Sequence, residues 1–165
     1  MAATFSFDIV SDVDMQEVDN ALQQTQKEVA QRYDLKDSNS TLTLDRKAKT
    51  IAVESGAEFQ LEQVVDVLKS RLIKRGLSLK TLKFGDVQQG TRGTARQTIT
   101  LATGIDRENA KKIVALLKEK GVKVTAQQQD EQVRVSGKSK DDLQAAIQAV
   151  REAELPIDVQ FTNYR

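Results

Sequence analysis

The stretch QVRVSGKSKDDLQAAIQAV, residues 132–150, changes its apolar period in the middle and decides the fold of the region around it. Before Gly137 the apolar residues alternate, with Val133 and Val135 on one side, which is typical of a β-strand. After Ser139 the spacing becomes i, i+3, i+4, i+7, which predicts a helix with one core-facing stripe. That stripe comprises Leu143, Ala146, Ile147 and Val150. The stretch therefore predicts a strand, a short turn and a helix.

The turn Gly137-Lys138-Ser139 has the residues that end the phosphate-binding loop G-x-x-x-x-G-K-[ST]. That loop requires a glycine five residues before Gly137, and Gln132 occupies the position. Because the residues between them have the pattern of a strand, we do not expect the nest of N–H groups that cradles phosphate. Gly137 instead ends a strand and Ser139 caps a helix, while a weak anion site at the helix start stays open as an alternative.

Strand and helix patterns follow the same order in both halves of the chain. Helix starts are indicated by capping boxes, Asp14 with Glu17 and Ser55 with Glu58. The expected strands are 4–10, 41–44, 50–53, 77–84, 97–102, 122–127, 132–136 and 156–161, and the expected helices are 14–33, 58–75, 106–120 and 139–151. The order of elements is thus βαββαβ, twice.

This order predicts an α+β protein of two tandem ferredoxin-like domains, with antiparallel sheets each covered by two helices on one face. The predicted domains are residues 1–86 and 94–165, and the stretch 87–93 next to several glycines is the predicted linker.

The sheet face away from the helices is predicted to be polar in the second domain. Its expected residues are Thr98, Thr100, Lys123, Thr125, Gln127, Arg134, Ser136, Gln160 and Thr162. Such a surface suits a phosphorylated or hydrogen-bonding ligand. An open sheet face is also polar simply because water covers it. Both interpretations stay open at this point.

The composition excludes several classes of function. The chain has no cysteine and no histidine, so it lacks thiolate nucleophiles and the commonest general base and metal ligands. We expect no metal, no cofactor and no enzymatic activity, because helix capping and solvation explain most of the carboxylates. Without an apolar run long enough to span a bilayer and without a signal peptide, we expect a cytoplasmic protein with no membrane partner.

Recognition of RNA by base stacking is disfavoured. Only 4% of residues are aromatic, and the expected third strands, 50–53 and 132–136, contain none. Phe5 and Phe7 share a strand face with Ile9, which makes them core candidates. The net charge of +1 also counts against a general nucleic-acid binder. The G-x-x-G match at 90–93 joins two expected strands, whereas a KH domain needs it between two helices.

Several stretches resemble the YajQ family of bacterial nucleotide-binding proteins. They are FSFDIVSDVDMQEV (5–18), FQLEQVVDVLKSRLIKRG (59–76), GIDRENAKKIVALLKEKGVKV (104–124), VRVSGKSKDDLQ (133–144) and FTNYR (161–165). The resemblance covers essentially the whole chain and implies two ferredoxin-like domains. It also implies binding of nucleotides or tRNA and, as in some members, a role as a cyclic di-GMP effector that partners a transcription regulator. The chain departs from the family pattern at Ala95-Arg96-Gln97 and at Asp130-Glu131.

We therefore expect a non-enzymatic nucleotide-binding protein, with an RNA-associated or protein-interaction module that uses the open sheet faces as the alternative. Cations would contact phosphate, and polar groups on the first strand, Ser6 and Asp8, would read a base edge. The candidate binding residues are Ser6, Asp8, Lys74, Arg75, Arg96, Arg134, Lys138, Lys140, Asn163 and Arg165.

Overall fold

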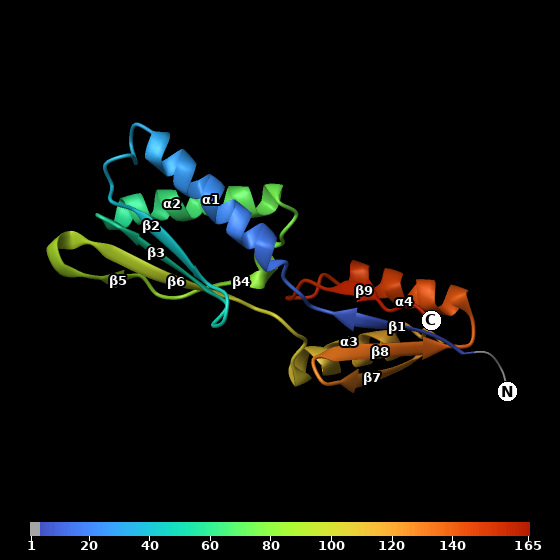
Figure 1. Ribbon diagram of the computed structural model, residues 1–165. Helices are drawn as coiled ribbons and strands as arrows, with labels where there is room; N and C mark the ends of the chain where they lie inside the picture. The colour runs from blue at the N-terminus through green and yellow to red at the C-terminus, as the bar shows by residue number, and fades with distance from the viewer. Residues whose placement is uncertain (1–3) are drawn as a thin grey trace. The chain divides into compact units, whose positions relative to one another are not determined.

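A computed structural model describes residues 4–165, which form two compact units (Figure 1). One unit is continuous and comprises Val13–Ala102. The other is made of two separate stretches of chain, the residues up to Asp12 and Thr103–Arg165. We call them the inserted unit and the discontinuous unit, because the first interrupts the sequence of the second.

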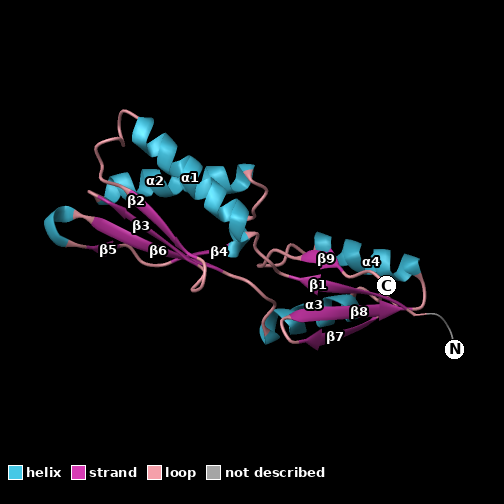
Figure 2. Ribbon diagram, viewed as in Figure 1, coloured by secondary structure: helices cyan, strands magenta, loops and turns pink. Residues whose placement is uncertain are grey.

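The inserted unit is an antiparallel sheet with two helices on one face (Figures 1 and 2). Its strand order is β2-β3-β6-β4, and the short β5 also pairs with β6. The elements are α1 (Met15–Gln31), β2 (Thr41–Asp45), β3 (Thr50–Ser55), α2 (Glu58–Lys74), β4 (Leu82–Phe84), β5 (Gln88–Gln89) and β6 (Ala95–Leu101), with 3₁₀ turns at Leu79–Thr81 and Thr91–Gly93. Its core lies between the helices and residues such as Ile51, Val53 and Ile99.

The discontinuous unit has the same architecture. Its strand order is β7-β8-β1-β9, with all neighbours antiparallel. The elements are β1 (Phe5–Val10), α3 (Arg107–Glu119), β7 (Thr125–Gln129), β8 (Gln132–Gly137), α4 (Lys140–Glu152) and β9 (Gln160–Thr162). The discontinuous unit has the ferredoxin-like order βαββαβ, whereas the inserted unit runs αββαββ, with its last strand, β6, in the sheet position that β1 holds in the other unit. Both units have the ferredoxin-like arrangement of sheet and helices, which confirms the predicted fold class.

The division of the chain differs from the predicted domains 1–86 and 94–165. β1 lies between β8 and β9 of the second half, and β6 lies between β3 and β4 of the first half. Each half therefore receives one of its two central strands from the other. The stretch 87–93 is not a linker but the β5 region and the turn that leads into β6, inside the inserted unit. The domain boundaries are corrected accordingly.

The exchange of strands also changes the predicted open face. Thr98 and Thr100 belong to β6, where they pair with Ala52 and Thr50 in the inserted unit. Lys123 precedes β7 and is not part of a strand. The other predicted positions on this face, in β7, β8 and β9, lie in the discontinuous unit.

The stretch that decides the fold, residues 132–150, behaves as predicted. Val133 and Val135 are fully buried in the core of the discontinuous unit, together with Phe7 and Ile9 of β1. All four residues of the predicted helix stripe are buried in the same core. Ser139 is the N-cap of α4, and its hydroxyl accepts a hydrogen bond from the Asp142 N–H at 3.1 Å. The pattern thus defines both the local structure and its buried side.

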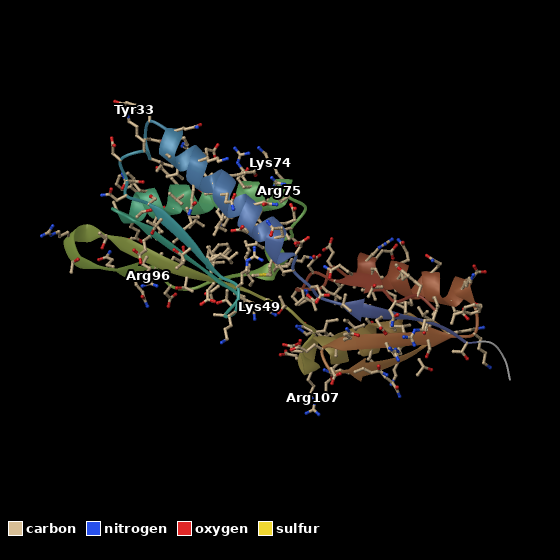
Figure 3. The ribbon with its side chains drawn as sticks, viewed as in Figure 1. Tyr33, Lys49, Lys74, Arg75, Arg96 and Arg107 are labelled. Atoms are coloured by element: carbon tan, nitrogen blue, oxygen red, sulfur yellow. The ribbon has the colours of Figure 1, made fainter. Side chains whose placement is uncertain are left out.

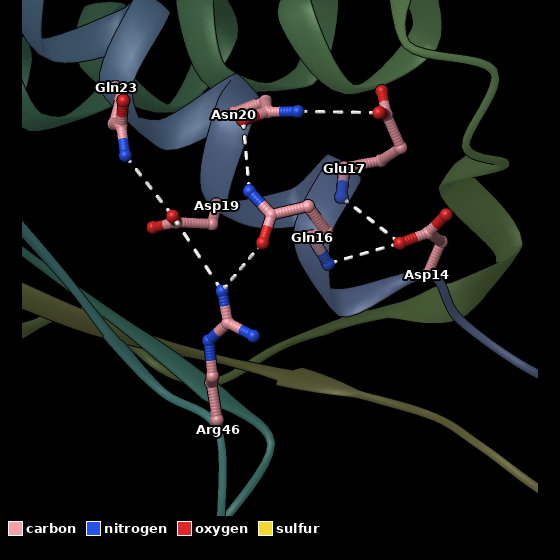
Figure 4. Close-up of polar contacts among 7 residues, drawn as sticks. All are labelled: Asp14, Gln16, Glu17, Asp19, Asn20, Gln23 and Arg46. Atoms are coloured by element: carbon pink, nitrogen blue, oxygen red, sulfur yellow. Dashed lines mark hydrogen bonds and ion pairs between the residues drawn. The ribbon is translucent and has the colours of Figure 1, made fainter.

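The two predicted capping boxes have different outcomes. Asp14 caps α1 by accepting hydrogen bonds from the N–H groups of Gln16 and Glu17 (Figure 4). Ser55 does not cap α2, because it is the last residue of β3 and its buried hydroxyl bonds Ser40 at 2.8 Å. Ala57 takes the N-cap position of α2 instead, without a side-chain hydrogen bond.

Candidate functional site

Asp8 in the middle of β1 is the centre of a polar cluster in the discontinuous unit. Its Oδ1 accepts a hydrogen bond from Arg134 Nε at 3.0 Å. Its Oδ2 accepts from Arg134 Nη2 at 3.4 Å and from Asn163 Nδ2 at 2.8 Å. The strand register explains this meeting, since Asp8 lies directly opposite Arg134 on β8 and Thr162 on β9. Asp8 is buried and most of its acceptor positions are used inside the unit, which argues against its predicted role in reading a base edge.

The cluster stays ionised over the neutral pH range. The hydrogen bond from Arg134 lowers the pKa of the Asp8 carboxyl below its ordinary value, although burial works in the opposite direction. The Asn163 amide and the charges of Arg134 and Arg165 lower this pKa further. The same hydrogen bond raises the pKa of the Arg134 guanidinium. Asp8 and Arg134 thus form a charged pair that carries little net charge.

The segment after β9 contains a β-bulge that shapes this region. Asp8 is opposite Thr162, whereas Ser6 exchanges two backbone hydrogen bonds with Arg165, of 3.1 and 2.9 Å. One residue of β1, Phe7, is consequently opposed by two residues, Asn163 and Tyr164. Asn163 takes a φ of 57°, a left-handed conformation that asparagine tolerates better than most residues.

The bulge sends two successive side chains to different places. The Asn163 amide contacts Asp8 on the open face of the sheet. The Tyr164 ring instead lies 6.0 Å from the ring of Phe7, a fully buried core residue. In a regular strand Asn163 would lie opposite Phe7, with its side chain on the core side of the sheet. The bulge is therefore what places both groups.

A hollow of about 400 Å³ opens beside the bulge. It lies where the start of β1, the first turns of α4 and the end of the chain come together. Its lining residues are Phe5, Ser6, Lys140, Leu143, Gln144, Tyr164 and Arg165. The ammonium group of Lys140 lies 5.6 Å from the centre of the Phe5 ring, and Tyr164 is largely exposed. The hollow therefore offers aromatic and aliphatic surface together with two cations.

The structure gathers six of the ten predicted site residues in this region. Three line the hollow, namely Ser6, Lys140 and Arg165. Three more form the polar cluster around Asp8. Lys138 is exposed in the turn between β8 and α4 and does not line the hollow.

The other three predicted residues belong to the inserted unit (Figure 3). Lys74 is exposed at the last residue of α2, and the next residue, Arg75, forms an ion pair of 3.5 Å with Glu17. Arg96 on β6 lies 3.5 Å from Glu54 and lines a hollow of about 340 Å³. These contacts are internal to the inserted unit.

Four lining residues were absent from the predicted set: Phe5, Leu143, Gln144 and Tyr164. Strand alternation predicts a core position for Phe5, and the helix stripe predicts one for Leu143. The signal for Gln144 is its spacing of four residues from Lys140, which puts both on one helix face. The position of Tyr164 depends on the bulge, which no local pattern indicates.

Two negative findings limit the chemistry of residues 4–165. Within this range no three His, Cys, Asp or Glu side chains lie close enough together to hold a metal ion. Nor is any helix there both long and apolar enough to cross a membrane.

Comparisons with known proteins agree with each other over the whole chain. A family model described as nucleotide-binding protein YajQ-like matches residues 5–165. A relative from Chloroherpeton thalassium named nucleotide-binding protein is 52% identical over 165 residues, covering 100% of both chains. Relatives with the same description from Bacillus cereus strain B4264 and Alkaliphilus oremlandii are 53% and 50% identical over the same length and coverage.

Proposed function

Because this chain belongs to the YajQ-like family of nucleotide-binding proteins, we propose that it is a non-enzymatic protein that binds a nucleotide in its discontinuous unit. The observation that carries this proposal is the hollow beside the β-bulge, with two cations and two aromatic rings in its lining. A nucleotide presents the matching groups, a flat base and an anionic phosphate.

The chemistry of the lining supports this choice of ligand. Tyr164 and Phe5 offer ring surface on which a base can stack, and the cations Lys140 and Arg165 can bond phosphate oxygens. The amide of Gln144 and the hydroxyl of Ser6 supply hydrogen bonds to a base edge or a ribose. The volume of about 400 Å³ lies at the lower end of small-molecule sites, which suits one nucleotide unit.

Binding without turnover is supported by the state of the Asp8 carboxylate in the polar cluster. Hydrogen bonds from Arg134 and Asn163 to both oxygens of Asp8 stabilise its ionised form. Its lowered pKa also makes it a weak base. Asp8 is thus suited to holding neighbouring groups in place.

The more specific proposal is that the ligand is cyclic di-GMP and that the liganded protein acts through a partner protein. A cyclic dinucleotide has two phosphates and therefore needs cations at more than one place. Besides Lys140 and Arg165 in the hollow, Arg134 lies on the open sheet face, opposite Asp8. One nucleotide unit would occupy the hollow and the other would lie over this face.

Isothermal titration calorimetry with a panel of mononucleotides and cyclic dinucleotides tests both levels of the proposal. Lys140→Ala is expected to weaken binding, because loss of one charge-assisted hydrogen bond costs about 1.5–3 kcal/mol, roughly tenfold to a hundredfold in Kd. Lys138→Ala is the matched control, since it removes the same charge two residues away and outside the hollow. No heat with any nucleotide, or equal effects of the two variants, would reject the proposed site.

A further inference from the structure

Arg134 is held by one edge of its guanidinium group. Its Nε and Nη2 both donate to Asp8, at 3.0 and 3.4 Å. A guanidinium has five N–H donors in a plane, so this contact uses two of them and leaves the Nη1–Nη2 edge for another acceptor. That edge has the geometry for two parallel hydrogen bonds to one ligand group.

The buried carboxylate of Asp8 fixes the orientation of the Arg134 side chain. The side chain of Asp8 is only 6% exposed, whereas that of Arg134 is 36% exposed. Asp8 is also held by Asn163, whose left-handed backbone belongs to the bulge. The guanidinium therefore loses little conformational freedom when a ligand binds, which favours affinity.

Arg134 lies in a row of cross-strand neighbours on the open face of the sheet. Gln127 on β7 is its direct cross-strand partner on one side, and Asp8 is its partner on the other. Thr162 on β9 continues the same row. The adjacent row contains Ser136 and Ser6, and Ser6 also lines the hollow. The other lining residues from β1 and α4, such as Phe5 and Leu143, lie on the helix-covered side of the sheet, so the open face that carries Arg134 and the hollow meet at Ser6.

Building on the proposed nucleotide site, we propose that the free Nη1–Nη2 edge of Arg134 binds a pair of acceptors on the nucleotide and that Asp8 is its positioning residue. Two ligand groups have this paired chemistry: two oxygens of a phosphate, and the O6 and N7 atoms of guanine. A lysine at this position would present a point charge without the paired geometry.

A structural ion pair alone would be a weaker explanation of the arrangement. Buried charged pairs are often replaceable by apolar residues without loss of stability. Here Asp8 is buried, whereas the Arg134 side chain is partly exposed on the open face of the sheet. This division of exposure is what a ligand contact with a buried support requires.

Titration of the full chain with AMP, adenosine, GMP and guanosine tests the inference. Arg134→Lys keeps the charge and removes the paired donors, and we expect it to weaken binding on the order of tenfold to a hundredfold. A loss confined to AMP and GMP identifies phosphate as the paired acceptor, and a loss confined to GMP and guanosine identifies guanine. Arg107→Lys, an exposed change on α3 of the same unit, is the matched control and should leave all four affinities unchanged.

The role of Asp8 has its own readout. Asp8→Asn, checked for an intact fold by circular dichroism, should weaken binding of the same ligands as Arg134→Lys. The double variant should bind no more weakly than Arg134→Lys alone. The two effects are not additive, because Asp8 acts on the ligand only by positioning Arg134. If the wild-type chain binds ligand but Arg134→Lys binds all four as tightly, the inference is overturned while the proposed function stands. If the wild-type chain binds none of them, the proposed function itself fails.

Discussion

The exchange of strands predicts that the discontinuous unit can be isolated by removing Val13–Ala102. In the structure the Gly104 N–H donates to the Ser11 carbonyl oxygen at 2.6 Å, so the two cut ends already lie side by side. A short Gly-Ser linker between Asp12 and Thr103 therefore spans the gap without strain. We expect this joined protein to fold with the strand order β7-β8-β1-β9.

The fragment 94–165, which follows the boundary suggested by sequence order, is expected not to fold. It lacks β1, whose Phe7 and Ile9 side chains are fully buried. Burial of each such side chain contributes about 1.5–3 kcal/mol, so the two together contribute about 3–6 kcal/mol. The net stability of a domain is only about 5–15 kcal/mol, and a small one is at the lower end. The fragment also leaves the facing edges of β8 and β9 without their partner strand.

Circular dichroism melts and amide NMR spectra of the two proteins provide the measurement. The joined protein should show dispersed amide signals and one cooperative thermal transition. The fragment 94–165 should show collapsed dispersion and no transition. A cooperatively folded fragment 94–165 beside an unfolded joined protein would refute the assignment of β1 to this unit.

Three further predictions concern the polar cluster and the joined protein. Asp8→Asn should lose about 2 kcal/mol of unfolding free energy at pH 7. Because the pKa of Asp8 is lowered in the folded state, this difference in stability should be fully present above the ordinary aspartate pKa of 3.8 and disappear as the pH falls through the folded-state pKa. Urea unfolding at several pH values measures the difference. A difference that does not change with pH would contradict the ion pair. Glycine at position 163 adopts the left-handed backbone without strain, whereas alanine is strained there. Asn163→Ala should therefore be about 1 kcal/mol less stable than Asn163→Gly in urea unfolding. Equal stability of the two variants would argue against the bulge. The joined protein should bind nucleotide as tightly as the full chain in calorimetry, and a large loss would assign part of the site to the inserted unit.

Local patterns were sufficient for the position of most elements. The stripe from Leu143 to Val150 and the alternation at Val133 and Val135 predict α4 and β8 within one or two residues. Residue type alone does not identify a helix cap, since Ser55 has the right type but belongs to β3. Whether such a residue is free to cap the helix depends on where the preceding strand ends. Pairing with the neighbouring strand determines that end, as Ala95 of β6 does for Ser55.

Strand partners could not be predicted because no local signal chooses between them. The stretches 5–10 and 95–101 both alternate and both precede a helix by a few residues. Either could complete the sheet of its own half, and only the packing of Phe7 against Val133 and Val135, or of Ile99 against Ile51 and Val53, decides the pairing. These contacts join residues far apart in sequence, so the predicted domain boundaries followed chain order instead.

The candidate site depended on the same missing information. Asp8, Arg134 and Asn163 were each selected for their polar or charged side chains, but their contact requires the β1–β8 register and the bulge after Thr162. The sequence does not indicate Tyr164, because its position requires a one-residue offset between two strands. Register and bulges are properties of strand pairs, so single-strand periodicity cannot supply them.

The insertion topology has a direct consequence for the site. β1 comes before the inserted unit, and β8, α4 and the bulge come after it, so the polar cluster and the hollow are built from the two ends of the chain. Every hydrogen bond that holds Asp8 joins these two ends within the discontinuous unit. Asp8 can therefore position Arg134 only when β1 has entered the sheet between β8 and β9. Formation of the site is in this way coupled to closure of the discontinuous unit, and a change that weakens β1 should reduce nucleotide affinity and stability together.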